Sequence, residues 1–345
     1  MNAATGALLI TLANAGYWFG GSTERIEVRW AVRGGPPACL LEWRLSAEEA
    51  KLADGRFELP ADDEAAILTL KIPEARTRTV LCWEYALRDS MNNQILSTGE
   101  RTIKVFPNDS LTDLAGRLRG KRILGVGMDE NWTTFLKAAE FDCTYVDQLA
   151  QLAAVPADII LIGLECPARE PFWQRTIEER ARNGASVMIL AQQSSGGICG
   201  FPLQRRRRPA DLSWFDAHPL LAECQAADWA TWFRAGVKDI FALQLPADAA
   251  ALEIVHWPRE TPGDTPAPLD ALLAVQAIEG GRIVFCQLPL GDWRRDPLSR
   301  QFMRNALEYL ATRVEPTPPP SRRTTSQLEA RHDPPTIQIP AGVER

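Results

Sequence analysis

The chain has 345 residues, a length that favours two domains over one. With 46% hydrophobic and 24% charged residues it can bury ordinary cores, and its formal net charge of -6 excludes the strongly basic surface of a nucleic-acid-binding protein. No apolar run reaches the roughly 18 residues that a membrane-spanning helix needs. We therefore expect neither a nucleic acid nor a membrane as a partner.

The seven cysteines are odd in number and scattered, with no Cys-x-x-Cys pair. Several lie within apolar runs, where reduced thiols pack as small hydrophobic side chains. We expect no disulfide framework, no metal site and no cofactor. The apolar run at residues 7–12, followed by Ala13-Asn14-Ala15, could be a short signal peptide, but no Lys or Arg precedes it. A first β-strand and a cytoplasmic location are favoured over secretion.

Residues 1–107 have an all-β pattern. Strand-like runs are separated by turn sequences such as Gly20-Gly21-Ser22, with no helical periodicity between them. This spacing predicts an immunoglobulin-like (Ig-like) β-sandwich whose core is filled by Trp30, Trp43 and Trp83. Residues 17–19 (Tyr-Trp-Phe) either pack in this core or form an exposed platform for a sugar ring. The predicted strands are residues 7–12, 25–33, 39–45, 66–72, 79–88 and 94–106.

Residues 108–313 alternate between strand and helix patterns. The clearest unit is an apolar run at residues 157–162, an amphipathic segment at 170–182 and a second apolar run at 185–193, which predict a β-α-β unit of a parallel sheet. Neither run alternates between apolar and polar residues, so both strands should be covered on both faces. Because ligands bind at the carboxyl ends of such strands, the candidate site residues here are Asp129, Glu165, Cys166 and Gln192.

The rest of this region predicts a long loop, further strands and a helix. Periodicity fails between residues 194 and 232, and loops of this length are usually functional, so Trp214 and Trp232 are candidate ligand-binding residues. The run Arg205–Arg208 either docks a polyanion such as an acidic glycan or forms a solvated face. Glu279-Gly280-Gly281 predicts a tight hairpin at a sheet edge. Residues 314–345, rich in Pro, Arg, Ser and Thr, predict a disordered tail.

Several segments share their order with a known family: residues 157–163, 183–192, 217–221, 281–288 and 300–310. Together they resemble the degenerate class I glutamine amidotransferase-like domain, akin to the trimerisation domain of bacterial β-galactosidases, that follows β-sandwich domains in some bacterial family 2-type glycoside hydrolases. The resemblance implies a flavodoxin-like, three-layer α/β fold and an accessory role. It also implies a carbohydrate or a glycoside hydrolase catalytic domain as partner, and self-association into a homo-oligomer.

The residues of an amidotransferase site are incomplete in this chain. At the expected strand-to-helix elbow, residues 163–167 place Cys166 one position late and follow it with a proline. A thiol nucleophile needs a nearby base, and of three histidines only His256 ends a predicted strand. A glycosidase would need two carboxylates on a catalytic scaffold such as a barrel of about 250 residues, for which no room remains.

We therefore expect a non-catalytic accessory region of a carbohydrate-active enzyme, which serves assembly or glycan positioning. Two alternatives remain open. One is a small hydrolase or amidotransferase that uses Cys166 with His256 as its catalytic residues. The other is a stand-alone glycan-binding protein.

Overall fold

The computed structural model describes most of the chain up to residue 312. The chain divides into two compact units, Met1–Arg313 and Val314–Arg345. The predicted disordered tail lies outside the described residues. The structure describes residues 6–12, 16–32, 38–59, 65–108, 111–163, 171–192, 196–207, 212–228, 239–246, 249, 251–258 and 268–312.

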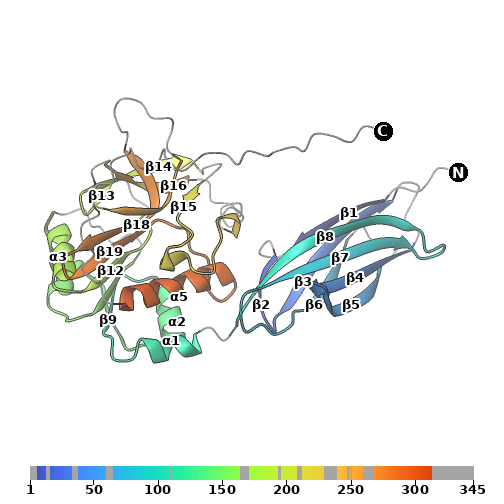
Figure 1. The fold of residues 1–345 in the computed structure, drawn as a ribbon, viewed down its shortest axis with the longest axis horizontal. Coiled ribbons are helices and arrows are strands. Elements are labelled where there is room, and N and C mark those ends of the chain that lie inside the picture. Colours follow the sequence, from blue (N-terminus) through green and yellow to red (C-terminus); the bar gives the residue numbers. More distant parts are fainter. Residues whose placement is uncertain are drawn as a thin grey trace, which may run out of the picture. The chain divides into compact units, whose positions relative to one another are not determined.

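The N-terminal part of the chain forms a β-sandwich (Figure 1). Its two sheets share one core, in which Trp30 and Trp83 are buried and Trp43 is partly buried. All strand pairs are antiparallel except β2 with β8. One sheet has the order β1 (Gly6–Leu12), β3 (Thr23–Val32), β6 (Ala65–Lys71), and the other has the order β2 (Tyr17–Phe19), β8 (Ile95–Phe106), β7 (Thr79–Asp89), β4 (Cys39–Ala47), β5 (Ala50–Leu59).

Two features of the sandwich differ from the sequence prediction. Strand β2 is buried along its whole length, so the interpretation of Tyr17–Phe19 as an exposed sugar platform is wrong. Strand β5 was missed because Asp54-Gly55 has the composition of a turn. Gly55 lies opposite Trp43, whose ring occupies the space of a Cβ: one built on Gly55 would be 2.7 Å from Cζ2 of Trp43.

A single mixed sheet of eleven strands runs through the described part of residues 123–286. From β10 to β19 neighbouring strands are parallel, and beyond β19 they are antiparallel. Strand β17 (Leu252–His256) also pairs with β18, and β15 (Ser213–Trp214) pairs with β17. The main order is β10 (Cys143–Val146), β9 (Ile123–Val126), β11 (Ile159–Ile162), β12 (Ser186–Ile189), β19 (Gly281–Cys286), β18 (Leu269–Ile278), β16 (Asp239–Leu245), β14 (Phe201–Arg207), β13 (Gly196–Ile198).

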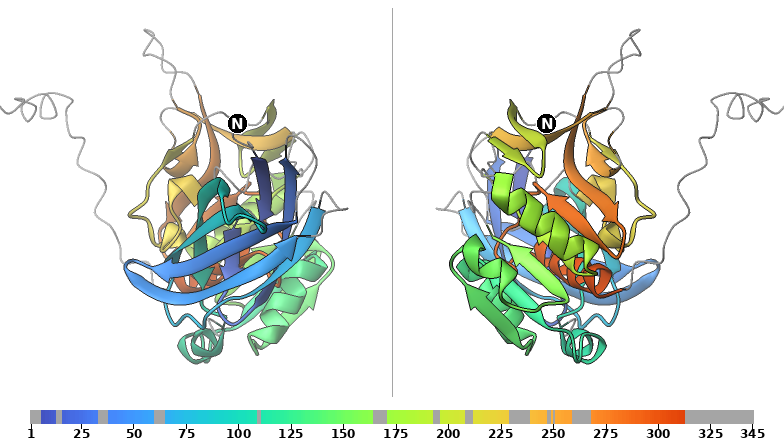
Figure 2. Two further views of the ribbon diagram at one scale, coloured as in Figure 1. Left: turned by 90° about the vertical axis from the view of Figure 1, so that its right-hand side faces the viewer. Right: turned by 90° about the vertical axis from the view of Figure 1, so that its left-hand side faces the viewer.

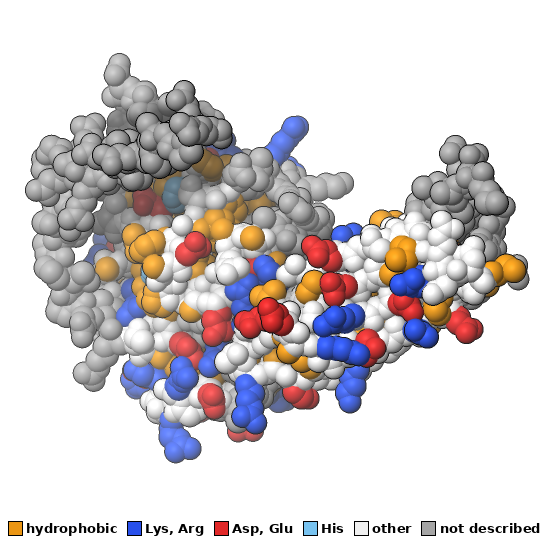
Figure 3. Space-filling view, turned by 45° about the vertical axis from the view of Figure 1, so that its right-hand side comes forward, with side chains coloured by type: hydrophobic (Ala, Val, Ile, Leu, Met, Phe, Trp, Pro, Cys, Tyr) orange, Lys and Arg blue, Asp and Glu red, His pale blue; other side chains and the backbone are white. Residues whose placement is uncertain are grey.

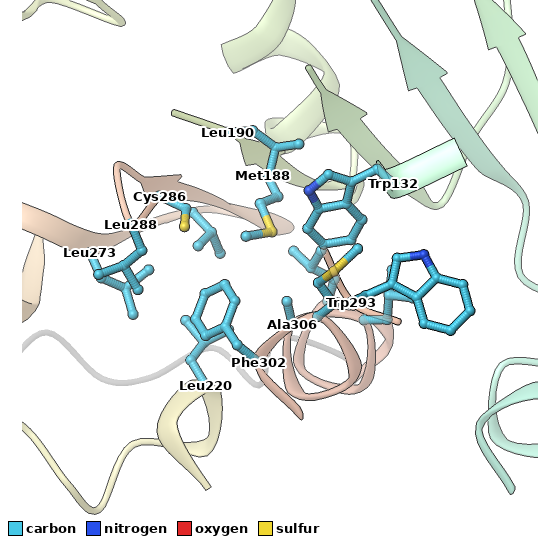
Figure 4. Close-up of a cluster of buried hydrophobic side chains, with 14 of the residues drawn as sticks. Trp132, Met188, Leu190, Leu220, Leu273, Cys286, Leu288, Trp293, Phe302 and Ala306 are labelled. Atoms are coloured by element: carbon cyan, nitrogen blue, oxygen red, sulfur yellow. The ribbon is translucent and has the colours of Figure 1, made fainter. Parts of the chain in front are cut away.

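The two faces of the parallel strands belong to two separate cores. One core receives α1 (Thr112–Arg117), α2 (Glu130–Ala138) and α5 (Pro297–Ala311), and in Figure 4 Trp132, Met188 and Phe302 converge in it. The other core receives α3 (Pro171–Arg182) and the short helix η2 (Leu149–Ala153). Figure 2 shows α3, light green in the right-hand view, lying over the strands. Successive residues of each strand alternate between the cores, as the two-residue period of a strand requires.

The predicted flavodoxin-like, three-layer α/β domain is wrong. Strands predominate in the described residues, and the sheet continues past its parallel part through a set of antiparallel strands. Strands β13 and β14 form where a long loop was predicted. The β18–β19 hairpin lies inside the sheet rather than at an edge, because β19 pairs with β12 on its other side.

The carboxylate of Asp228 is fully buried and surrounded by donors. It accepts hydrogen bonds from the Tyr17 hydroxyl (3.2 Å), from the Arg78 guanidinium (3.0 Å) and from the Gln225 backbone N–H (2.8 Å), and it pairs with the Lys104 ammonium. A buried charge needs such partners, because their loss would leave it unsolvated and uncompensated. The cluster thus ties strands of the sandwich to the segment that follows the short helix η3 (Pro219–Leu221).

The surface carries both signs of charge. On the face shown in Figure 3, acidic and basic side chains are interspersed. In the part of the chain that the structure describes, no helix is both long enough and apolar enough to span a bilayer.

Replacement of Gly163 by alanine tests the tightest approach in the sheet. A Cβ on Gly163 would lie 1.9 Å from the backbone oxygen of Gly127, so the strand ends must move apart. We expect Gly163→Ala to lower the free energy of unfolding by about 1–3 kcal/mol, measured by urea denaturation. The matched control is Gly116→Ala in α1, where a Cβ meets nothing within 4 Å and stability should stay equal or rise by up to about 1 kcal/mol. Equal destabilisation by both changes would contradict the steric argument.

Candidate ligand-binding site

A cavity of about 600 Å³ lies at the carboxyl ends of β9, β12 and β19. We call it the edge cavity. Its volume is in the range of small-molecule sites, and its wall combines apolar side chains with a few polar groups. The described residues that line it are Asp129, Asn131, Trp132, Leu190, Ala191, Gln192, Arg205, Ile240, Phe241, Cys286, Gln287, Leu288, Pro289 and Leu290.

The edge cavity exists because the sheet curves. Its wall includes residues that follow β9 and also Arg205 of β14, six strand positions further along the sheet. In a flat sheet with strands about 4.8 Å apart these positions would be about 29 Å apart. A cavity of this volume is only about 10 Å across, so the antiparallel strands must turn back over the carboxyl ends of the parallel ones. They form the wall that faces α2.

Asp129 holds the first turn of α2 at the cavity. Its Oδ1 accepts a hydrogen bond from the backbone N–H of Trp132 (2.8 Å), and its backbone oxygen accepts one from the hydroxyl of Thr133 (2.7 Å). An aspartate at this position satisfies an N–H group that the helix leaves unpaired. The side chain therefore has a structural role, and its carboxylate also contributes an acceptor to the cavity wall.

Two buried glutamines meet where β12 and β19 end. The backbone N–H of Gln192 donates to Oε1 of Gln287 (3.0 Å), while Nε2 of Gln192 donates to the backbone oxygens of Gly163 (2.9 Å) and Leu190 (2.8 Å). Gln192 is 5% exposed and Gln287 is 3% exposed. The Nε2 of Gln287 is buried and has no hydrogen-bond partner among the described residues.

The thiol in the cavity wall is not activated. Cys286 is fully buried, and this desolvation raises its pKa to about 12. Because the thiolate is the nucleophilic form of cysteine, Cys286 is a protonated, unreactive group at neutral pH. Among the described residues no group of three histidine, cysteine, aspartate or glutamate side chains is placed to hold a metal ion.

The sequence-predicted site residues fall into three groups. Asp129 and Gln192 line the same cavity. Trp214 and His256 lie together on the β15–β17 ladder, but neither belongs to the described lining of the cavity, and Nδ1 of His256 is 2.7 Å from the backbone oxygen of Trp257. The third group, Glu165, Cys166 and Trp232, lies outside the described residues, so the proposed pairing of Cys166 with His256 stays a prediction.

Asn131 and Gln287 are polar residues of the described cavity wall that are not among the predicted site residues, whereas Arg205 belongs to the arginine run that the sequence predicts as part of a loop. Gln287 follows β19, just as Gln192 follows β12. The sequence predicts β19 in a hairpin at the edge of the sheet, so it does not predict that β19 lies beside β12. Arg205 lies instead on β14, where Phe201 and Leu203 are buried, Arg206 is partly buried and the other residues are exposed.

The high pKa of Cys286 predicts how it reacts with iodoacetamide. With a pKa near 12, on the order of 10⁻⁴ to 10⁻⁵ of this thiol is ionised at pH 7.5, and raising the pH to 9 should leave it almost unlabelled in the folded protein. Peptide mass spectrometry would measure the labelling, with the half-buried Cys82 as the internal comparison and the urea-unfolded chain as the positive control. Labelling of folded Cys286 with a midpoint near pH 8.5, the ordinary thiol value, would contradict the prediction.

Comparisons with known proteins were made for sequence and for structure. No protein-family model matches the chain, and no curated protein sequence matches it. Two structures of the CARDB domain of the PF1109 protein from Pyrococcus furiosus are similar to part of it. A crystal structure in complex with di-metal ions shares 13% identity over 30% of this chain and 96% of that chain, with a TM-score of 0.22. A solution NMR structure of the same domain shares 13% identity over 31% of this chain and 98% of that chain, with a TM-score of 0.23. At this level the similarity carries no conclusion about a site or an activity.

Proposed function

We propose that this chain is a non-catalytic accessory region of a carbohydrate-active enzyme and that its edge cavity holds a sugar unit of the glycan. The observation that carries the proposal is the convergence of a carboxylate, three amides and a guanidinium on one cavity of about 600 Å³. A monosaccharide presents several hydroxyl groups, each of which can donate and accept a hydrogen bond. A wall that mixes donors and acceptors among apolar side chains suits such a ligand.

A binding role fits the chemistry of the wall better than a catalytic one. General acid-base or nucleophilic catalysis requires a group whose pKa is tuned for the task. The thiol of Cys286 is shifted in the opposite direction, toward the inert form, and Asp129 is engaged as the cap of α2. The described wall thus offers recognition groups and no activated nucleophile.

The sequence resemblance described above implies the same role, although the flavodoxin-like fold that it also implies is not the fold of this chain. Accessory regions of glycoside hydrolases position glycan or assemble the enzyme without cleaving the substrate themselves. In this chain a β-sandwich precedes the mixed sheet that carries the cavity. We propose that the catalytic scaffold is supplied by another domain or chain, and that the edge cavity contributes a sugar subsite.

Sugar binding can be measured directly by isothermal titration with D-glucose, D-galactose and D-glucuronate. We expect saturable binding of at least one of them, and we expect Asp129→Asn to weaken it about tenfold, the value of one hydrogen bond to a charged group. Asparagine caps a helix about as well as aspartate, so α2 should stay folded. The control is Asp142→Asn, an exposed aspartate that does not line the described cavity.

Two results would contradict the proposal. One is the absence of saturable binding for all three sugars. The other is binding that Asp129→Asn and Asp142→Asn affect equally, because the sugar would then bind at another place.

A further inference from the structure

Strand β5 is a long strand at the end of a sheet. It has ten residues, whereas the other terminal strands β1, β2, β6, β10 and β13 have three to seven. One side of β5 pairs with β4, and no strand in the described ranges pairs with its other side. Edge strands present unpaired N–H and C=O groups, and proteins usually shorten them or interrupt them with proline. Because β5 is neither short nor interrupted by proline, its free side is suited to pair with a further strand.

The face of β5 that points toward the sandwich core is only partly covered. Ala53 and Phe57 are partly buried against that core, as is Trp43 of β4. The ring of Trp43 extends across Gly55, where a Cβ would lie 2.7 Å from Cζ2 of the ring. A glycine inside a strand often marks a place where another backbone comes close. A strand added beside β5 would complete the burial of these side chains.

The geometry of an antiparallel ladder limits how two copies of β5 can pair. Residues directly opposite each other either exchange hydrogen bonds or both point away, so an odd position can face only an odd one and an even position only an even one. The twofold axis of a symmetric pair must therefore pass through a residue. In β5, Ala50–Leu59, the longest such overlaps are residues 50–58, centred on Asp54, and residues 51–59, centred on Gly55.

Charge distinguishes these two registers. Centred on Asp54, the pairing would set two aspartates opposite each other, which is destabilising. Centred on Gly55, it sets Asp54 of each copy opposite Arg56 of the other, which gives two pairs of opposite charge. The side chain of Asp54 is 58% exposed and that of Arg56 is 74% exposed. Their ion pairs within the chain, with Lys51 and Glu42, are exposed and contribute little, so both groups remain available to a facing strand.

We propose that two copies of this chain associate through β5, antiparallel about a twofold axis at Gly55. The five-stranded sheets of the two sandwiches then form one continuous sheet. Both copies use the same surface, so the interface is closed and association stops at two chains. This surface lies on the sandwich, away from the residues that line the edge cavity. The inference therefore goes beyond the proposed function and does not depend on it.

Sedimentation velocity tests the proposal on the whole chain, at concentrations up to about 100 μM, because the dimer fraction depends on chain concentration. We expect a reversible dimer of twice the chain mass of 38.3 kDa. Asp54→Arg and Arg56→Asp each set like charges opposite each other at both pairs, so each should raise the Kd of the dimer at least about tenfold. An equal mixture of the two variants should dimerise again, because both positions are then basic in one chain and acidic in the other.

Glu84→Arg is the matched control. Glu84 is exposed on β7, in the same sheet, and β4 separates β7 from β5. The control reverses a charge as Asp54→Arg does, but away from the free side of β5. It should leave the Kd of the dimer unchanged, and an equal loss of dimer in this variant would contradict the specific pairing.

Three other results would overturn the proposal. One is a chain that stays monomeric over this concentration range or forms an oligomer of another size. The second is a dimer that neither Asp54→Arg nor Arg56→Asp weakens, because the copies would then associate elsewhere. The third is a mixture of the two variants that stays monomeric, because Asp54 would then not face Arg56. None of these results affects the sugar-binding proposal, which is tested with its own ligands.

Discussion

The burial of four neighbouring strands on both faces is the constraint on which the rest of this structure depends. Every residue of β9, β11, β12 and β19 is buried. Their backbone groups can pair only within the sheet, and their side chains must pack into one of two cores. Polar side chains are therefore excluded along most of the sheet and collect where the strands end. Asp129, Gln192 and Gln287 all occupy such positions.

The antiparallel strands turn this edge of the sheet into a cavity that stays partly open to solvent. Parallel strands alone would leave their carboxyl ends open to solvent, with α2 on one side. Strands β14 and β16 close the opposite side, and they bring Arg205, Ile240 and Phe241 to face residues that follow β9. The antiparallel strands that depart from regular α/β layering are thus the strands that form the cavity. A sheet that stayed flat would have strands and polar ends but no cavity of this size.

The sequence predicts those parts of the fold and of the cavity in which the local pattern of apolar and polar residues permits one structure. The apolar runs at residues 157–162 and 185–193 predict strands that are buried on both faces. Because ligands bind at the carboxyl ends of such strands, the sequence also predicts Asp129 and Gln192 as site residues, and both line the cavity. Strand β14 was missed because only Phe201 and Leu203 are buried among charged neighbours. The curvature, and with it Gln287 and Arg205, depends on strand pairings far apart in the chain, which local patterns do not encode.

The Gln192–Gln287 pair connects stability with recognition. Apolar residues at both positions would satisfy the core, yet the chain buries two amides, and Nε2 of Gln287 has no hydrogen-bond partner among the described residues. An unpaired buried donor costs about 1–3 kcal/mol, a large part of the net stability of an ordinary domain. Costs of this kind concentrate at functional sites, because a group satisfied within the protein has nothing to offer a ligand. The hydrogen bonds of Gln192 to Gly163 and to Gln287 join the ends of β11, β12 and β19, so the pair stabilises the sheet and the wall of the cavity together.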